Sequence, residues 1–135
     1  MTRPLYLLDT NILTGVLKKD ARIVNRLTEV LAADARLILS PVVFYEIRRG
    51  LLRRDARQQL GFFEQWIKTL KWDDLQRVDW NAAAEMWASE TAQGRPPQDA
   101  DILIAVQARR LKAILVTANE DHFKPLGIEI ENWLD

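Results

Sequence analysis

The chain has 135 residues, of which 48% are hydrophobic and 28% are charged, a balance typical of a folded globular protein. Nineteen basic residues balance nineteen acidic ones, which excludes a bulk electrostatic attraction to nucleic acid, so any such binding must come from local patches. The absence of cysteine excludes disulfides, thiolate metal sites and a cysteine nucleophile, and one histidine argues against a His-rich zinc site or a catalytic triad. Without an apolar run of about 18 residues or a signal-peptide pattern, we expect a soluble, cytoplasmic protein with no membrane partner.

The first predicted element is a strand over residues 5–8, whose unbroken apolar run is typical of a strand buried on both faces. The run ends at Asp9, which is followed by Thr10 and Asn11. Open α/β sheets place ligand sites at the carboxyl ends of strands, and a carboxylate is costly to bury there unless a cation compensates it. These polar residues could equally cap the next helix, so Asp9 alone leaves both interpretations open.

Helices alternate with strands along the rest of the chain. The start signal Ser40-Pro41, a helix-capping serine before a proline, marks the beginning of one helix. The predicted elements, in chain order, are helices over 12–17 and 21–33, a strand over 36–39, helices over 41–51 and 56–70, a short strand over 75–78, helices over 80–92 and 97–111, a strand over 113–116, a turn or helix over 119–124 and a last strand over 128–130. This order predicts an α/β fold with a parallel sheet covered on both sides, in a single domain over residues 1–135.

Two further acids lie in helices beside these strands. Glu46 flanks the apolar stripe of its helix, where it could bind a ligand or simply pair with Arg49 or Arg53. Asp101 aligns with the apolar face of its helix, and an acid aimed inward needs a partner, although only Arg95 precedes it closely. A favourable interaction with the helix dipole is the alternative explanation for Asp101.

In a parallel sheet these acids converge at one edge. Two unit negative charges about 4 Å apart repel by roughly 4 kcal/mol at an effective dielectric constant near 20. Several converging carboxylates therefore need a cation, and ligands that are all oxygen favour Mg²⁺ or Mn²⁺ over zinc. The polar segment 117–123 follows the third clear strand and could belong to this site or be an ordinary loop. Its His122 is predicted to be a surface residue rather than a metal ligand.

Four short motifs occur in order along nearly the whole chain: Leu8-Asp9-Thr10-Asn11, Ser40 through Tyr45-Glu46-Ile47, Asp101-Ile102-Leu103-Ile104-Ala105, and Thr117-x-Asn119-x-x-x-Phe123, followed by Asn132-Trp133. Each motif is weak alone, but their order and spacing are specific. In these residues the chain resembles the PIN-domain ribonucleases, and in particular the VapC-type toxins of toxin–antitoxin pairs. Asn132-Trp133 is similar to the closing strand of that family.

The resemblance implies a three-layer α/β/α PIN domain that acts as a Mg²⁺- or Mn²⁺-dependent endoribonuclease. In such an enzyme water attacks an RNA phosphodiester and leaves a 5′-phosphate and a 3′-hydroxyl. Matched position by position, the catalytic acids and metal ligands are Asp9, Glu46 and Asp101. Many members have a fourth acid where this chain has Asn119, so Asp121 or Glu120 would substitute, and the number of metal ions stays open. The residues expected to orient carboxylates and water are Thr10, Asn11, Thr117 and Asn119.

The resemblance also implies a small antitoxin protein as partner, and a homodimer. An arginine run beside Glu46 could contact RNA backbone or that partner, or be a solvated helix face; it comprises Arg48, Arg49, Arg53 and Arg54. Three alternatives stay open: an aspartyl-phosphate enzyme, a housekeeping PIN nuclease without an antitoxin, and an inactive PIN-like binding module. The first is disfavoured because such enzymes usually carry a second Asp two residues after the nucleophile, where this chain has Asn11.

Overall fold

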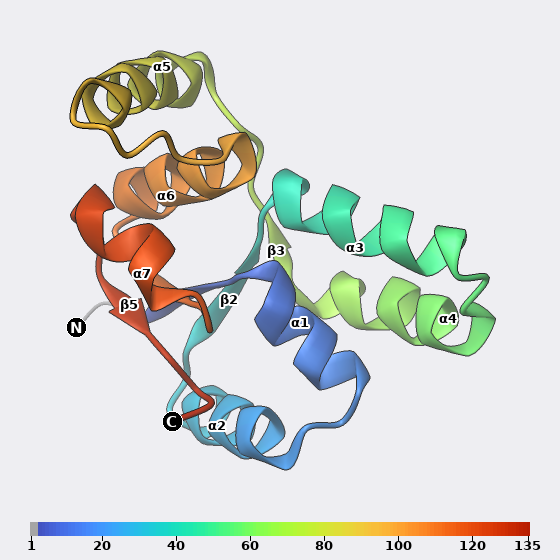
Figure 1. The fold of residues 1–135 in the computed structure, drawn as a ribbon. Coiled ribbons are helices and arrows are strands. Elements are labelled where there is room, and N and C mark those ends of the chain that lie inside the picture. Colours follow the sequence, from blue (N-terminus) through green and yellow to red (C-terminus); the bar gives the residue numbers. More distant parts are fainter. Residues whose placement is uncertain (1–2) are drawn as a thin grey trace.

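The computed structural model describes residues 3–135, and within that range five parallel strands form one sheet in the order β3-β2-β1-β4-β5. The strands are β1 Leu5–Leu8, β2 Arg36–Leu39, β3 Lys71–Trp72, β4 Ile114–Val116 and β5 Ile130–Glu131. The α-helices are α1 Thr10–Leu17, α2 Ala21–Ala32, α3 Pro41–Arg53, α4 Arg57–Trp66, α5 Arg77–Ala92, α6 Asp99–Leu111 and α7 Glu120–Phe123, with 3₁₀ turns η1 Ile67–Thr69 and η2 Lys124–Leu126. Figure 1 places α1, α3 and α4 on one side of the sheet and α5, α6 and α7 on the other.

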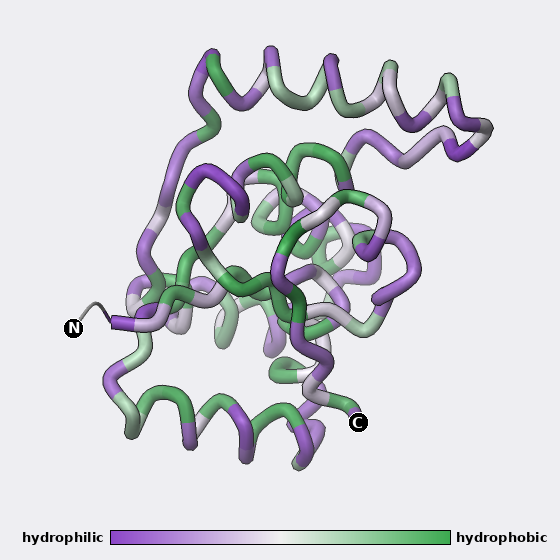
Figure 2. The backbone as a smooth tube through the Cα atoms, turned by 90° about the vertical axis from the view of Figure 1, so that its left-hand side faces the viewer, coloured by the Kyte–Doolittle hydropathy of each residue, from purple (hydrophilic) through white to green (hydrophobic). Residues whose placement is uncertain are grey.

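The central strand β1 is buried at three of its four positions. Its Leu7 pairs with Ile38 of β2 on one side and with Leu115 of β4 on the other, and all three side chains are buried. Hydrophobic residues run through the middle of the molecule, whereas the outer helices alternate between hydrophilic and hydrophobic residues (Figure 2). The strand is apolar at every position because both of its faces are covered by helices, as the sequence predicted.

The strand order creates a crevice at the carboxyl edge of the sheet. From β1 the chain moves through β2 to β3 in one direction, and then β4 and β5 continue on the other side of β1. Because crossovers between parallel strands are right-handed, the helices of these two halves lie on opposite faces. The loops after β1 and β4 therefore separate, and this switch point is where open α/β sheets bind ligands.

Several predicted boundaries differ from the structure, mostly at the sheet edges. The predicted strand over 75–78 is wrong: residues 77 and 78 begin α5, and the edge strand is instead Lys71–Trp72. Both residues of that strand are exposed, so no apolar run marks it. The predicted helix over 56–70 gives way to 3₁₀ geometry after Trp66. Strand β5 ends before Asn132-Trp133, which follow the closing strand rather than form it.

Trp133 nevertheless belongs to the core. Its side chain is 2% exposed, its ring lies 5.7 Å from that of Tyr6, and its indole N–H donates to Glu131. This anchoring holds the end of the chain against the central strand. No helix in the described range is long and apolar enough to cross a membrane.

We expect Leu7→Ala to lower the free energy of unfolding by about 2–5 kcal/mol, because Leu7 is fully buried and its neighbours cannot fill the resulting cavity. The matched control is Leu31→Ala on α2, whose side chain is 47% exposed and which should change stability by less than about 0.5 kcal/mol. Urea unfolding followed by circular dichroism measures both. Equal losses in the two variants would contradict the assignment of β1 as the core strand.

Candidate active site

A cleft of about 550 Å³ opens at the carboxyl edge of the sheet. Its lining includes Asp9 at the end of β1, Glu46 from α3, Asp101 from α6 and Asn119 from the loop after β4. Residues separated by up to 110 positions thus meet at one surface. The three acids singled out in the sequence line the same cleft.

Asp9 is the most constrained of these acids, with 5% of its surface exposed. Its Oδ1 accepts the backbone N–H of Thr10 at 2.8 Å, which makes Asp9 the N-cap of α1. Its Oδ2 accepts the Thr117 hydroxyl at 2.8 Å and, more weakly, the Asn11 amide at 3.4 Å. The helix-capping interpretation of Asp9 is therefore confirmed, and the same carboxylate also lines the cleft.

The loop after β4 orients the hydroxyl that holds Asp9. Thr117 is fully buried, and its Oγ1 accepts the backbone N–H of Asn119 at 3.0 Å. A hydroxyl has one proton to donate and lone pairs that accept. Because one lone pair of Thr117 Oγ1 accepts the Asn119 N–H, the hydroxyl proton is directed to Asp9. Asn11 links the same two loops, since its Oδ1 accepts the backbone N–H of Ala118 at 3.1 Å. The predicted orienting residues Asn11 and Thr117 thus tie β1 to β4.

Glu46 is held by a threonine rather than by an arginine. The Thr10 hydroxyl donates to Glu46 Oε1 at 2.8 Å and joins the first turn of α1 to α3. Among residues 3–135, neither Arg49 nor Arg53 forms an ion pair with Glu46. Arg49 instead lies over the ring of Tyr45, 5.0 Å from its centroid. The simple pairing that the sequence left open for Glu46 is therefore absent.

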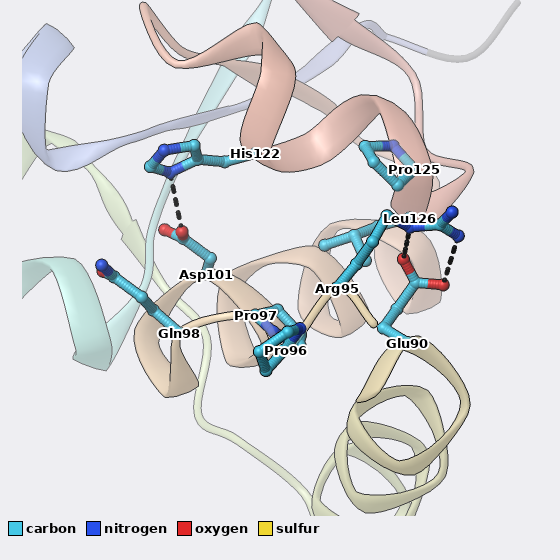
Figure 3. Close-up of a pocket in the computed structure, with 9 residues that line it drawn as sticks. All are labelled: Glu90, Arg95, Pro96, Pro97, Gln98, Asp101, His122, Pro125 and Leu126. Carbon is cyan, nitrogen blue, oxygen red and sulfur yellow. Dashed lines mark hydrogen bonds and ion pairs between the residues drawn. The ribbon is translucent and has the colours of Figure 1, made fainter. Parts of the chain in front are cut away.

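Asp101 contacts the only histidine of the chain. His122 Nδ1 lies 3.0 Å from Asp101 Oδ2, and the two side chains face one another from α6 and α7 (Figure 3). The Asp101 side chain is 15% exposed and that of His122 is 49% exposed. Arg95, the basic residue that precedes Asp101, is paired with Glu90 instead. The expectation that His122 is an ordinary surface residue misses this contact.

Burial raises the pKa of the Asp9 carboxyl above its ordinary value of 3.8. The hydrogen bonds from Thr117 and Thr10 oppose this rise, while the negative charges of Asp101 and Glu46 add to it. In the part of the chain that the structure describes, neither Asp9 nor Glu46 has a basic side chain as ion-pair partner. Uncompensated carboxylate charge and an all-oxygen donor set suit a hard divalent cation.

The acids do not yet form a closed coordination shell. Within residues 3–135 no three acidic or histidine side chains lie close enough together to hold a metal ion as they stand. Like charges repel one another, and His122 contacts one oxygen of Asp101. A cation at this cleft would have to draw Asp9, Glu46 and Asp101 toward one another.

A model of the PIN domain family matches residues 6–127. This chain belongs to the PIN-domain family. It is similar to ribonuclease VapC1 of Haemophilus influenzae strain R2866, with 27% identity over 135 residues, covering 96% of this chain and 98% of that protein. Ribonuclease VapC2 of Rickettsia felis is also 27% identical with the same coverage. Among solved structures, VapBC2 of Rickettsia felis bound to a promoter DNA fragment has a TM-score of 0.85 at 27% identity, covering 96% of this chain and 98% of that chain.

These likenesses confirm the resemblance to VapC-type PIN domains and the α/β/α fold that it implied.

The residues considered for the fourth position of the site do not all line the cleft, unlike the three core acids. Asn119 lines the acidic cleft, whereas Asp121 is exposed on α7 and does not line it. Glu120 accepts the side-chain N–H of Asn132 at 3.2 Å. Of these three residues, Asn119 is the one that lines the cleft together with Asp9.

Most of the predicted arginine run lies away from the acidic cleft. Arg48 is paired with Glu64 of α4 at 2.9 Å, and Arg53 is exposed at the end of α3. The basic side chains that do line the cleft are those of Lys18 and Arg22, which the sequence did not identify as site residues. Arg22 is itself paired with Asp20, so Lys18 is the freer of the two.

A spacing signal could have found Lys18. Thr10, Thr14 and Lys18 follow one another at intervals of four residues, so they lie along one face of the first helix. Glu46, Gly50 and Arg54 have the same spacing on α3, and both rows line one groove between the two helices. That groove runs from Glu46 at the acidic cleft to Arg54 at its basic end.

For this PIN domain without bound metal, we expect Asp9→Asn to raise the unfolding midpoint at neutral pH. The raised pKa of Asp9 means that the folded state binds its proton more tightly than the unfolded state does. The contribution of this protonated carboxyl to the free energy of unfolding is complete below pH 3.8, and it is lost as pH rises through the higher pKa of the folded state. Asparagine is uncharged at every pH, so the Asp9→Asn variant does not lose stability in this way.

The measurement is thermal unfolding in EDTA between pH 3.5 and 8, with Glu85→Gln on the exposed face of α5 as a charge-matched control. The control should keep the wild-type pH dependence. An Asp9→Asn curve that parallels the wild type would show that Asp9 carries no burial cost.

Proposed function

We propose that this PIN domain is a Mg²⁺- or Mn²⁺-dependent endoribonuclease and the toxin of a toxin–antitoxin pair. The observation that carries the proposal is the convergence of Asp9, Glu46 and Asp101 on one cleft, with no basic side chain paired to Asp9 or Glu46 in the described range. The similarity along nearly the full chain to proteins named ribonuclease VapC supports it.

Asp9, Glu46 and Asp101 would hold the cation, and the residues around them fix their orientation. When bound, a divalent cation offsets phosphate charge and lowers the pKa of a coordinated water. Thr117 and the Thr10 backbone hold both oxygens of Asp9, and the Thr10 hydroxyl holds Glu46. These hydrogen bonds leave further lone pairs of each carboxylate for the cation. The loops thereby prearrange the ligands, as the outer partners of metal sites do.

RNA would be attracted by local cations, since the chain has no net charge. Lys18 lines both the acidic cleft and the groove between α1 and α3, and Arg54 lies at the other end of that groove. A phosphate backbone that follows this groove passes from these cations to the acids. Of the arginines predicted for RNA or antitoxin contact, Arg49 and Arg53 are exposed enough to serve, whereas Arg48 is engaged by Glu64.

The partner proposal rests on the relatives. The similar Rickettsia felis structure is a VapBC complex, and VapBC complexes of other bacteria share the fold. We propose that a small antitoxin protein binds this chain and blocks the acidic cleft. The homodimer implied by the family resemblance stays a prediction.

We expect Asp101→Ala to reduce RNA cleavage by more than about 100-fold, because loss of a direct ligand should exceed the 10–100-fold cost of losing an outer partner. Asn119→Ala should give an intermediate loss, since its amide lines the cleft without charge. Asp121→Ala should retain most activity because its side chain lies outside the cleft.

The measurement is cleavage of a single-stranded RNA across a Mg²⁺ titration. The unfolding midpoint of each variant is compared with that of the wild type, so that only variants that fold as the wild type does are interpreted. Complete loss in Asp121→Ala would make it a fourth ligand. Wild-type activity in Asp101→Ala would overturn the site.

A toxin should arrest growth when expressed alone, and co-expression of the small protein encoded beside it should restore growth. Asp9→Asn should abolish the arrest while it still binds that neighbouring protein, because the substitution removes a charge without changing the shape of the site. Growth curves and co-purification measure the two properties separately. Harmless expression of the wild type, with RNA cleavage retained in vitro, would favour a housekeeping nuclease.

A further inference from the structure

A second cavity, of about 260 Å³, lies directly beside the acidic cleft. Its apolar walls come from Pro96 and Pro97, in the loop between α5 and α6, and from Pro125 and Leu126 in η2. Figure 3 shows the Asp101–His122 contact on one side of this cavity and the Glu90–Arg95 ion pair on the other. We call it the proline pocket.

The proline pocket and the acidic cleft share three lining residues: Gln98, Asp101 and His122. The boundary between the two hollows is therefore made by a proposed metal ligand and its histidine neighbour. A polymer whose phosphodiester lies at the acids places its next unit beside this boundary. At about 260 Å³ the pocket is smaller than the roughly 300–1,000 Å³ typical of small-molecule sites, so it favours a group the size of one base over a larger ligand.

Arg95, whose side chain is 51% exposed, is oriented at this pocket by hydrogen bonds. Its Nε and Nη2 donate to the two oxygens of Glu90 at 3.1 and 3.3 Å, and Nη2 also donates to Gln93 at 2.6 Å. The Glu90 side chain is only 9% exposed, so this pair fixes the plane of the guanidinium. No hydrogen bond from residues 3–135 uses Nη1, which leaves two oriented N–H donors for a ligand.

The charges around the pocket favour a neutral group over a phosphate. Glu90 neutralises Arg95, and Asp101 adds a negative charge at the boundary. The proline rings offer flat apolar faces, and Gln98 offers both a donor and an acceptor. A nucleobase has a flat apolar face and a polar edge with acceptors, and therefore matches this combination.

We infer that the proline pocket holds the base of one nucleotide beside the cleaved phosphodiester, and that Arg95 determines which base is preferred there. This inference rests on the proposed ribonuclease function. In this inference the phosphodiester is cleaved in the acidic cleft, and the proline pocket determines which RNA sequence is preferred.

The test compares Arg95→Lys with Arg57→Lys in cleavage of a random-sequence RNA pool, followed by sequencing of the product ends. Lysine keeps the charge next to Glu90 but lacks the planar fork of donors. Arg57 is a matched control because it is exposed on α4 and pairs with Asp55. Pro96→Ala is the second pocket variant, since it removes one wall without touching the ion pair.

We expect wild-type protein and Arg57→Lys to share a base preference at one position near the cut. Arg95→Lys should change that preference by at least about fivefold, the lower end for loss of an arginine–base contact. Pro96→Ala should weaken the preference at the same position. Total cleavage of the pool by Arg57→Lys should stay within about twofold of the wild type, because Arg57 lines neither the proline pocket nor the acidic cleft.

Two results would overturn the inference while leaving the ribonuclease proposal intact. One is an unchanged preference in both Arg95→Lys and Pro96→Ala with cleavage retained. The other is a uniform fall in cleavage with unchanged preference, which would make Arg95 a structural residue only. If wild-type protein with Mg²⁺ cleaves no RNA at all, the proposed function fails, and this inference fails with it.

Discussion

The arrangement of the cleft depends on how one carboxylate, that of Asp9, is held at the end of the buried central strand β1. Burial disfavours the charge, and the neighbouring acids Asp101 and Glu46 disfavour it further. Hydrogen bonds from Thr10 and Thr117 stabilise the charged form, and these residues follow β1 and β4 on either side of the switch point. The same bonds fasten β1 to β4 and begin α1. The carboxylate that lines the cleft therefore also joins the two central strands and caps the first helix.

Much of this fold follows from the sequence because its central strands are buried on both faces. β1 and β4 are apolar at every position, and β2 is apolar after Arg36. The start of α3 is marked by Ser40, whose hydroxyl accepts the backbone N–H of Val42. The edge strand β3 could not be found in this way, because Lys71 and Trp72 are both exposed and the strand exists through pairing with β2. The apolar residues at 75 and 78 instead flank the start of α5. Edge pairing is a tertiary event, so no local pattern records it.

The site was predictable to the extent that parallel strands bring their carboxyl ends together. That rule places Asp9, Glu46 and Asp101 at one cleft. It does not reveal the partners of those acids, since His122 reaches Asp101 only through the packing of α7 against α6. Nor does it show that Arg95, the nearest basic residue in sequence, is held by Glu90 instead. Charge partners depend on side-chain direction, which a one-dimensional pattern does not contain.

Asp101 connects the two hollows of this surface, and its position constrains how the protein can act. One side of its carboxylate faces the cleft that contains Asp9 and Glu46, while His122 contacts it at the boundary of the proline pocket. A ligand in the pocket would therefore lie against the residue that would also bind the cation. Because Glu90 already orients the guanidinium of Arg95, a bound base would pay little of the entropic cost of ordering that side chain. Under the proposed function, the phosphodiester at the acids and the base in the proline pocket would be bound side by side, with Asp101 at the boundary between them.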